Sequence, residues 1–428
     1  MTDSKSNTRQ QNIKGWIVVA CSALFYMYQF MIRVSPNIMN DELLSNFALD
    51  SAGLGIMIGA YNWSYSAMQI PLGITIDRWG PRFFLCVAAG LCAISCIIFG
   101  NTTSTIIGGS ARFLMGMGSA CGLIGTIKLG TIWLEPKHLA KVTGLAIFMG
   151  TAGASLGGVP LEILLNKIGF EKTMEFLGLI GIVVCILLYF LVNNHPFINP
   201  HEEQPDIYAN SHPFKDILIL VKTPQAWILA TYGMFMYLPI TVIGVVWGVS
   251  FVKNIAEVSE VMAASVVSTM FFGAALGSPF FAFFSDYIKN RRLPMVFGSI
   301  VTALVWFIVI TFKAPLYLLF VLFFLGGFAY AAKCLSFASI CETMPLKMSG
   351  VSIAFMNAVV MSTGIIFLPI IGILIDTHWN GQLINNFPHY TAGDYRFAFI
   401  IIPIFLALSC FMIFFVKETH PDYKILKE

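Results

Sequence analysis

Long runs of apolar residues alternate with short polar breaks along most of the chain, and the breaks contain Asn, Pro, Gly or charged residues. Each run holds about 20 residues, which is the length that an α-helix needs to cross roughly 30 Å of hydrocarbon. The pattern therefore predicts an all-α membrane protein with 12 transmembrane helices. The expected spans are 15–38, 51–75, 83–100, 105–132, 142–165, 174–192, 225–249, 258–284, 294–312, 315–342, 348–375 and 396–416.

The longest polar connector separates the sixth predicted span from the seventh. It contains several Xaa-Pro steps, which mark loops, and a short interfacial helix is expected near residues 213–221. The chain is thus expected to form two pseudo-symmetric six-helix bundles. The predicted division is a tail at 1–14, a half at 15–192, a linker at 193–224, a half at 225–416 and a tail at 417–428.

Composition and charge narrow the class of protein. Hydrophobic residues make up 57% of the chain and charged residues 11%, whereas about a quarter of a soluble domain is charged. Sixteen of the 25 lysines and arginines fall in tails and loops on the side of the two termini, and four fall in the opposite loops. Because positive loops stay in the cytoplasm, both termini are expected there. The net charge of +3 is too small to indicate a nucleic acid partner.

Chemistry-bearing motifs of other classes are missing from the sequence. The nine cysteines lie in or beside apolar spans and form no CxxC pair, so they are expected to pack as small apolar residues. There is no nucleotide-binding loop, metal-ligand cluster or nucleophile triad. We therefore expect no enzyme, no cofactor, no metal site and no obligate protein partner.

A short charged hinge follows the second span of each half. In the first half it reads Gly73-x-x-x-Asp77-Arg78-x-Gly80-x-Arg82, and the second half has a weaker copy with Asp286, Arg291 and Arg292. The first hinge, together with the twelve spans, resembles the loop signature of the major facilitator superfamily, and the resemblance covers essentially the whole chain. It implies that the hinges hold the cytoplasmic helix ends together in one access state. The alternative is that these charges only set the topology. The residues assigned to this gate are Gly73, Asp77, Arg78, Gly80, Arg82, Asp286, Arg291 and Arg292.

Two further stretches carry the resemblance. Arg112-Phe113-Leu114-x-Gly116-x-Gly118-x-Ala120 is similar to the fourth-helix pattern of the superfamily. The glycines of residues 150–158 are similar to the fifth-helix run of its antiporters, but Ala154 stands where those have a proline. That difference argues against an antiporter.

One polar stripe on the first span predicts a substrate site. Ser22, Tyr26, Gln29 and Arg33 recur at steps of four, three and four, so they share one helix face. A guanidinium is costly against lipid, and its planar fork suits a carboxylate or a phosphate. The run around Arg33 also resembles the first helix of organic-anion carriers, although the second arginine that phosphate carriers have in span 7 is missing. This favours a carboxylate. In the alternative, Arg33 reaches the outer interface.

Other polar residues within the spans complete the predicted site. Lys128 and Lys333 are expected near the inner ends of spans 4 and 10, either as an anion-attracting vestibule or paired with Glu135 and Glu342. Glu162 is the best candidate for proton coupling, and Arg112 is a candidate to pair with it. The remaining candidates for the cavity are Tyr61, Asn62, Tyr65, Tyr237 and Asn357.

The sequence thus predicts a secondary transporter in a bacterial inner membrane. Its substrate is expected to be a small polar solute that bears a carboxylate, such as an amino acid, a short peptide or an organic acid. Alternating access would rock the two halves around a central cavity. The alternatives are a multidrug or lipid exporter, a sugar or nucleoside carrier, and a receptor that binds without transport.

Overall fold

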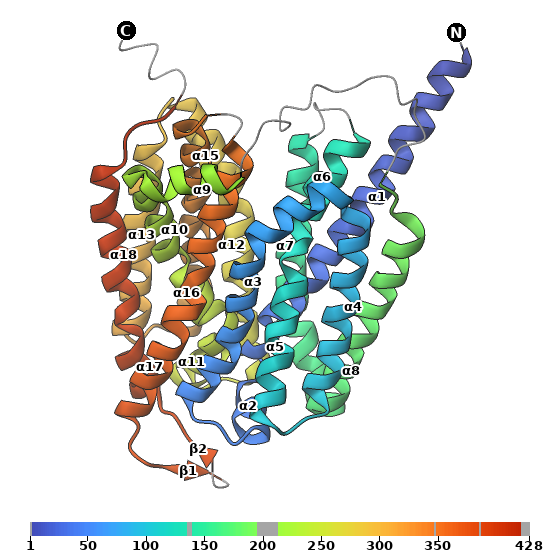
Figure 1. Cartoon of the computed structure of the whole chain (residues 1–428). Helices are drawn as coiled ribbons and strands as arrows, with labels where there is room; N and C mark the ends of the chain where they lie inside the picture. The colour runs from blue at the N-terminus through green and yellow to red at the C-terminus, as the bar shows by residue number, and fades with distance from the viewer. Residues whose placement is uncertain (1, 135–138, 195–212, 346–347, 385–386, 421–428) are drawn as a thin grey trace.

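The computed structural model describes residues 2–134, 139–194, 213–345, 348–384 and 387–420 (Figure 1). Nearly all of this part is helical. One antiparallel hairpin of β1 (Leu383–Ile384) and β2 (Phe387–Pro388) lies between the last two groups of helices. The expected all-α membrane fold is confirmed.

Helices follow one another with short connections in both halves. The N-terminal half contains α1 (Thr2–Val34), η1 (Ser35–Asn37), α2 (Asn40–Asn46), α3 (Ser51–Trp79), α4 (Pro81–Gly100), α5 (Thr105–Ser119), α6 (Cys121–Trp133), α7 (Leu139–Leu156) and α8 (Val159–Leu191). The linker contributes α9 (Pro213–Lys222). The C-terminal half contains α10 (Pro224–Pro239), the π-helix η3 (Ile240–Trp247), α11 (Gly248–Ala256), α12 (Glu260–Tyr287), α13 (Arg292–Thr311), α14 (Leu316–Tyr330), η4 (Ala331–Lys333), α15 (Cys334–Thr343), α16 (Ser349–His378), α17 (Ala392–Phe399), α18 (Ile401–Met412) and η6 (Ile413–Phe415).

These helices cover the predicted spans in order. Among the described residues, ten helical segments are long and apolar enough to cross a membrane, or eleven if the bent pair of α2 and the start of α3 is counted. One of these segments, Gly144–Leu191, holds two predicted spans, and Gly169 breaks the helix between them with φ 80°. Twelve crossings agree with this arrangement, and the exact number stays a prediction.

Local expectations for the linker and the N-terminal tail had different outcomes. Helix α9 lies where the short linker helix was expected. The polar segment at 1–14 was expected to be a cytoplasmic tail; in the structure it is helical from Thr2 onward and continuous with α1, and its place outside the membrane stays a prediction. The helix continues through this polar stretch because polar residues without Gly or Pro do not interrupt helical hydrogen bonding.

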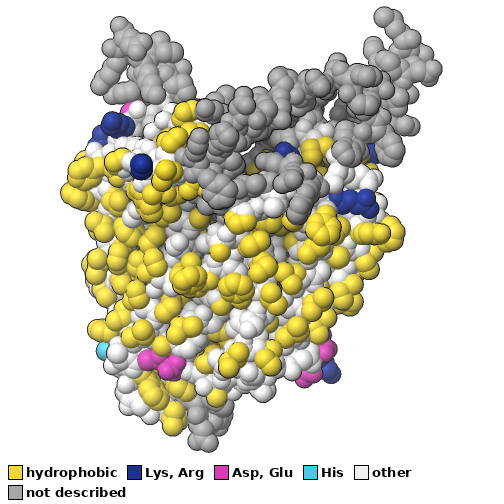
Figure 2. Space-filling model, viewed as in Figure 1, with side chains coloured by type: hydrophobic (Ala, Val, Ile, Leu, Met, Phe, Trp, Pro, Cys, Tyr) yellow, Lys and Arg dark blue, Asp and Glu magenta, His cyan; other side chains and the backbone are white. Residues whose placement is uncertain are grey.

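The outer surface of the bundle suits lipid. Figure 2 shows hydrophobic side chains over the middle of the visible face, with most of the visible Lys and Arg toward one end and most of the visible Asp and Glu toward the other. Large apolar side chains such as Phe190, Phe283 and Phe414 are more than half exposed. So much exposed apolar surface would be unfavourable in water but is stable in hydrocarbon.

Both ends of the described chain lie at the same end of the molecule, which we call the terminal side; the opposite end is the distal side (Figure 1). The halves pack most extensively through α3 of one and α16 of the other. A Cβ on Gly372 would lie 2.2 Å from the carbonyl oxygen of Ser51, so only glycine allows this approach. Toward the terminal side the helices of the two halves diverge (Figure 1).

Hydrogen bonds join the halves on the distal side. The Asn37 amide donates to the carbonyls of Ile243 and Gly244 at 2.9 and 2.7 Å, and its oxygen accepts from the N–H of Val249 at 2.9 Å. Asn40 donates to Val246 at 2.8 Å. These acceptors lie in the π-helix η3, whose altered hydrogen-bonding pattern frees carbonyls for partners outside the helix.

A second contact between the halves caps a helix. The Asp376 carboxylate at the end of α16 accepts from the backbone N–H groups of Ser51 and Ala52 at 3.1 and 2.7 Å, and from the Tyr390 hydroxyl at 2.5 Å. A carboxylate at a helix N-terminus is favoured by the unpaired N–H groups and the helix dipole. We call the contacts made by Asn37, Asn40 and Asp376 the distal seam.

Candidate functional site

Arg33 lies between the halves, at the centre of a group of aromatic rings. Its guanidinium carbon is 5.6 Å from the centroid of Phe30, 5.9 Å from Tyr61, 5.7 Å from Tyr65 and 5.5 Å from Tyr237. The side chain is 4% exposed. This buried position between the halves differs from the position at the outer membrane interface that the alternative gave Arg33. The electron-rich faces of the rings stabilise the cation without neutralising it.

A second cation reaches the same aromatic group from the other half. The Lys333 ammonium is 4.3 Å from the centroid of Tyr237, 5.2 Å from Tyr330 and 5.6 Å from Phe337. Lys333 ends the 3-10 turn η4, which interrupts the span between α14 and α15. Since Arg33 and Lys333 both contact the ring of Tyr237, they lie close together. We call these two cations and their rings the dibasic site.

The dibasic site has no acid of its own. In the described part of the chain, neither Arg33 nor Lys333 forms an ion pair, and the Arg33 guanidinium donates a hydrogen bond to the sulfur of Met361 at 3.0 Å. Glu342, one expected partner of Lys333, instead binds Arg291 at 2.8 Å, so that expectation was wrong. A thioether is a weak acceptor, and buried charge without a counterion is unfavourable. An anion between the two halves would relieve this cost.

The other predicted site residues surround this centre in different ways. Tyr26 and Gln29 are buried on the same face of α1 as Arg33, and Tyr61 donates to Gln29 at 3.2 Å. The Gln29 amide nitrogen is buried without an acceptor among the described residues, so it is free to donate to a bound solute. Asn357 is half-buried one helical turn from Met361 and therefore shares its face of α16.

Two further predicted site residues are Asn62 on α3 and Lys128 on α6. Asn62 packs directly against Gly364, where a Cβ would lie 2.3 Å from its amide nitrogen, so it belongs to the contact of α3 with α16. Lys128 is half-buried on α6. Its part in an anion-attracting vestibule stays a prediction.

The predicted pairing of Arg112 with Glu162 was wrong. Arg112 is 1% exposed, donates to the carbonyl of Ile32 at 3.1 Å and lies 5.3 Å from the ring centroid of Tyr61. Glu162 is fully buried and accepts from the side chain of Asn166 at 2.8 Å. Spacing along the chain placed both near one membrane face, but their helices direct the side chains to different neighbours.

The hinge of the N-terminal half is bound to the end of its own last span. The backbone N–H of Arg82 donates to the Asn194 side chain at 3.0 Å, and its guanidinium donates to the Tyr189 carbonyl at 2.7 Å. Gly80 joins α3 to α4 with φ 79°, a conformation that favours glycine. Gly73 is half-buried, with open space around its α-carbon. The side chains of Asp77 and Arg78 fall outside the described part of the structure.

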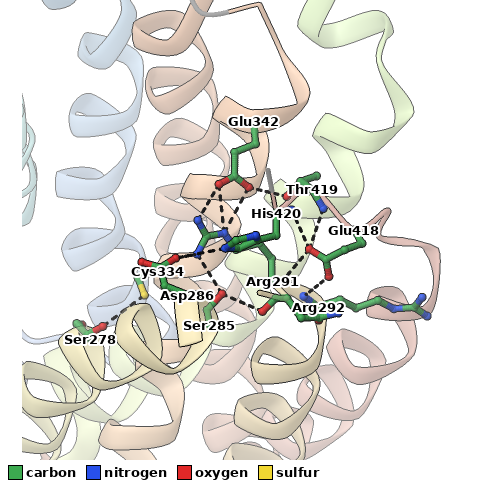
Figure 3. Close-up of polar contacts among 11 residues, drawn as sticks. Ser278, Ser285, Asp286, Arg291, Arg292, Cys334, Glu342, Glu418, Thr419 and His420 are labelled. Carbon is green, nitrogen blue, oxygen red and sulfur yellow. Dashed lines mark hydrogen bonds and ion pairs between the residues drawn. The ribbon is translucent and has the colours of Figure 1, made fainter. Parts of the chain in front are cut away.

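The hinge of the C-terminal half forms a larger network (Figure 3). Arg291 binds Glu342 at 2.8 Å and Asp286 at 2.5 Å, and so joins α12 to α15. The Glu418 carboxylate accepts from the backbone N–H groups of Arg291 and Arg292 at 2.9 and 3.0 Å. We call these contacts the tail network. It lies within one half, and sequence reasoning missed Glu418 because nothing in the polar tail marks it.

The tail network favours the ionised form of the Glu418 carboxyl group. Burial alone would raise the pKa of the Glu418 carboxyl, but four backbone N–H groups bind its charged form and hold the pKa below the ordinary value. Those N–H groups belong to Arg291, His420, Arg292 and Thr419. Glu418 is therefore a carboxylate at neutral pH, and it fixes the start of α13.

The fold and the site together define a class of protein: a multi-pass membrane transporter for a small solute. The family model for the Major Facilitator Superfamily matches residues 16–252 and 229–428. The chain belongs to this superfamily, and its members are transporters rather than enzymes.

Curated relatives resemble this chain at low identity. "Probable galactarate/D-glucarate transporter GudP" of Escherichia coli (strain K12) is 23% identical over 89% of this chain and 92% of its own length. "Probable L-galactonate transporter" of the same strain is 23% identical over 44% of this chain and 42% of its length. "Probable sulfoacetate transporter SauU" of Cupriavidus necator is 20% identical over 42% of each.

Solved structures share the fold. A bacterial homologue of the human lysosomal transporter Spinster, in an inward-facing and unoccupied conformation, matches with a TM-score of 0.76 at 17% identity. The match covers 94% of this chain and 97% of that one. The nucleoside transporter NupG matches with a TM-score of 0.72 at 12% identity, covering 93% and 99%. At these identities the likeness extends to the fold alone.

Proposed function

We propose that the protein is a secondary transporter of organic acids, and that its preferred solutes are hydroxylated acids with two carboxylates. The observation that carries the proposal is the pair of cations, Arg33 and Lys333, which come from opposite halves and have no ion-pair partner in the described residues. Arg33 would bind one carboxylate through its guanidinium fork, and Lys333 would bind the other. The names of the relatives, which refer to galactarate, D-glucarate and L-galactonate, support an acid of this kind.

The aromatic lining fits the rest of such a solute. Hydroxyl groups of Tyr26, Tyr61, Tyr65 and Tyr237 come from both halves and can exchange hydrogen bonds with a polyhydroxylated chain. Ring faces also exclude bulk water, which strengthens the attraction between the cations and the acid. A neutral sugar would leave both cations unpaired.

Transport would proceed by alternating access in a bacterial inner membrane, with the terminal side in the cytoplasm. The excess of lysine and arginine on that side supports the orientation. In this arrangement the distal seam is closed toward the exterior, and the hinges at Arg82 and Arg291 rearrange when the terminal side closes. An anion that binds both halves favours the state in which they approach each other around it.

A thermal-shift panel on the purified protein tests the proposal. Wild type, Arg33→Ala, Lys333→Ala and the control Lys313→Ala are heated with D-glucarate, L-galactonate or D-galactose; Lys313 is exposed in a loop. A ligand at 100 times its Kd adds about 2.7 kcal/mol to the free energy of unfolding. We expect D-glucarate to stabilise wild type and the control more than L-galactonate, and D-galactose to stabilise neither.

Each variant has its own expected response. Arg33→Ala should lose the response to both acids, whereas Lys333→Ala should lose the preference for the diacid. Equal stabilisation of wild type by D-galactose and D-glucarate would overturn the proposal.

A further inference from the structure

A hydrogen bond joins the two halves at the dibasic site, where the guanidinium of Arg33 meets the sulfur of Met361. The Nη2 of Arg33 donates to the Sδ of Met361 at 3.0 Å. Arg33 lies on α1 and is 4% exposed, and Met361 lies on α16 and is 6% exposed. The contact is therefore buried, and it connects the predicted anion-binding group of one half to a side chain of the other.

The packing of α16 holds the backbone of Met361 at this place. Three residues further along the helix, Gly364 lies against the side chain of Asn62 and so fixes α16 against α3. The Thr363 hydroxyl donates to the carbonyl of Met234 at 3.1 Å and fixes α16 against α10. The methionine side chain itself is unbranched and flexible. It can therefore turn away from the guanidinium while its backbone stays in place.

A thioether is a particular kind of partner for a buried cation. It carries no charge and is a weak hydrogen-bond acceptor, so it relieves only part of the cost of burying the guanidinium. A carboxylate forms shorter and stronger bonds to the same group, because those bonds are charge-assisted. An acid that reaches Arg33 would therefore replace the sulfur, whereas a carboxylate side chain at this position would have paired with Arg33 permanently.

We propose that Met361 is an internal ligand of Arg33, which an arriving carboxylate displaces and which takes its place again when the acid leaves. This inference rests on the proposed function, since displacement occurs only if an acid binds Arg33. Breaking the bond to sulfur subtracts from the binding free energy of every acid that uses the guanidinium. Met361 thus lowers the affinity of the site and favours release of the acid.

Isothermal titration of the purified full-length protein with D-glucarate tests the effect on affinity. Met361→Leu nearly conserves the side-chain volume but removes the acceptor. Its Kd should be about threefold to tenfold lower than that of wild type, which is the range for one uncharged hydrogen bond. The control is Met356→Leu, the same substitution on the same helix. Met356 is fully buried and packs against Gly233, so this variant should bind as wild type does.

A measurement without any solute tests the contact itself. The methyl groups of the methionines are labelled with carbon-13, and the NMR signal of Met361 is the one that Met361→Leu lacks. In Arg33→Ala this signal should move and narrow, because the side chain has lost its donor. The signal of Met356 should stay. In wild type, D-glucarate should move the Met361 signal and D-galactose should not. If Met361→Leu does not fold, one methionine signal should still respond both to Arg33→Ala and to D-glucarate.

Two results would overturn the proposal: a Met361 signal that is the same in wild type and Arg33→Ala, or a wild-type Kd for D-glucarate in Met361→Leu. A failure of the proposed function looks different. Wild type would then bind D-galactose as well as D-glucarate, while the Met361 signal would still change in Arg33→Ala.

Discussion

On the distal side, Asn37, Asn40 and Asp376 bind across the two halves, whereas on the terminal side Arg82 and Arg291 bind within their own half. The distal contacts are to backbone groups and are mostly buried. The tail network instead pairs charged side chains close to water. The two sides thus differ in what their contacts join: the distal seam connects one half to the other, and the contacts of Arg82 and Arg291 connect helices within one half.

The two terminal hinges share one arrangement and differ in the groups that bind their backbone. Arg82 and Arg292 each donate to a carbonyl near the end of the last span of their half and lie over the ring of that same residue, Tyr189 or Phe414. The backbone groups at the hinge are bound by Asn194 in one half and by Glu418 in the other. The repeated geometry agrees with an internal duplication. Among the described residues of the two hinges, the second copy adds a partly buried ion pair between Arg291 and Glu342.

The largest effect is expected from Asn37→Ala. The substitution removes three hydrogen bonds between the halves and leaves buried backbone groups without partners, which costs about 3 kcal/mol. That energy corresponds to roughly a hundredfold shift of the distal opening equilibrium. Hydrogen exchange of α2 and α11 should rise accordingly. The control is Asn46→Ala, whose amide bonds Thr102 within one half at 3.0 Å; an equal rise in that variant would contradict the comparison.

A smaller effect of a different kind is expected from Arg291→Ala. The variant leaves Glu342 and Asp286 without their cation, and bonds to charged groups contribute about 2 kcal/mol. The free energy of unfolding, measured by thermal melting, should fall by about that amount. Exchange of the distal helices should not change. Arg292→Ala, which removes one bond to the Phe414 carbonyl, should cost about 1 kcal/mol or less. Loosening of the distal seam in Arg291→Ala would show that the two sides are not separate.

The smallest effect concerns acid pH and Glu418. Because its pKa is held below the ordinary value, Glu418 contributes stability above the usual glutamate range, and this contribution is lost as the pH falls through the lowered pKa. Melting temperatures of wild type and Glu418→Gln should therefore converge in acid. They should differ by a few degrees at pH 7. A constant difference at every pH would mean that the carboxylate is not the stabilising form.

Much of the architecture was predictable, because the length and hydrophobicity of a span determine whether it can cross a bilayer. The interior position of the Arg33 side chain was predictable for a similar reason, because a charged side chain within a membrane span is unfavourable against lipid. The position of Lys333 beside Arg33 was not predictable, since the 3-10 turn η4 interrupts the α-helical periodicity of that span. The distal seam was missed because Asn37 binds carbonyls about two hundred residues away, which a π-helix makes available. Periodic patterns in a sequence indicate local secondary structure and do not indicate contacts between such distant residues.

The dibasic site lies between the distal side and the terminal side. A transported acid would therefore reach it from one side and leave it toward the other. Counterflow of labelled D-glucarate in proteoliposomes tests this claim most directly, with wild type, Arg33→Lys, Arg33→Ala and Lys313→Ala. Loss of a guanidinium that pairs with a buried carboxylate costs about 3 kcal/mol, so kcat/KM of Arg33→Ala should fall about a hundredfold or more, with Arg33→Lys between it and wild type. Lys313→Ala should transport as wild type does. Transport of D-glucarate by Arg33→Ala at the wild-type rate would contradict the account.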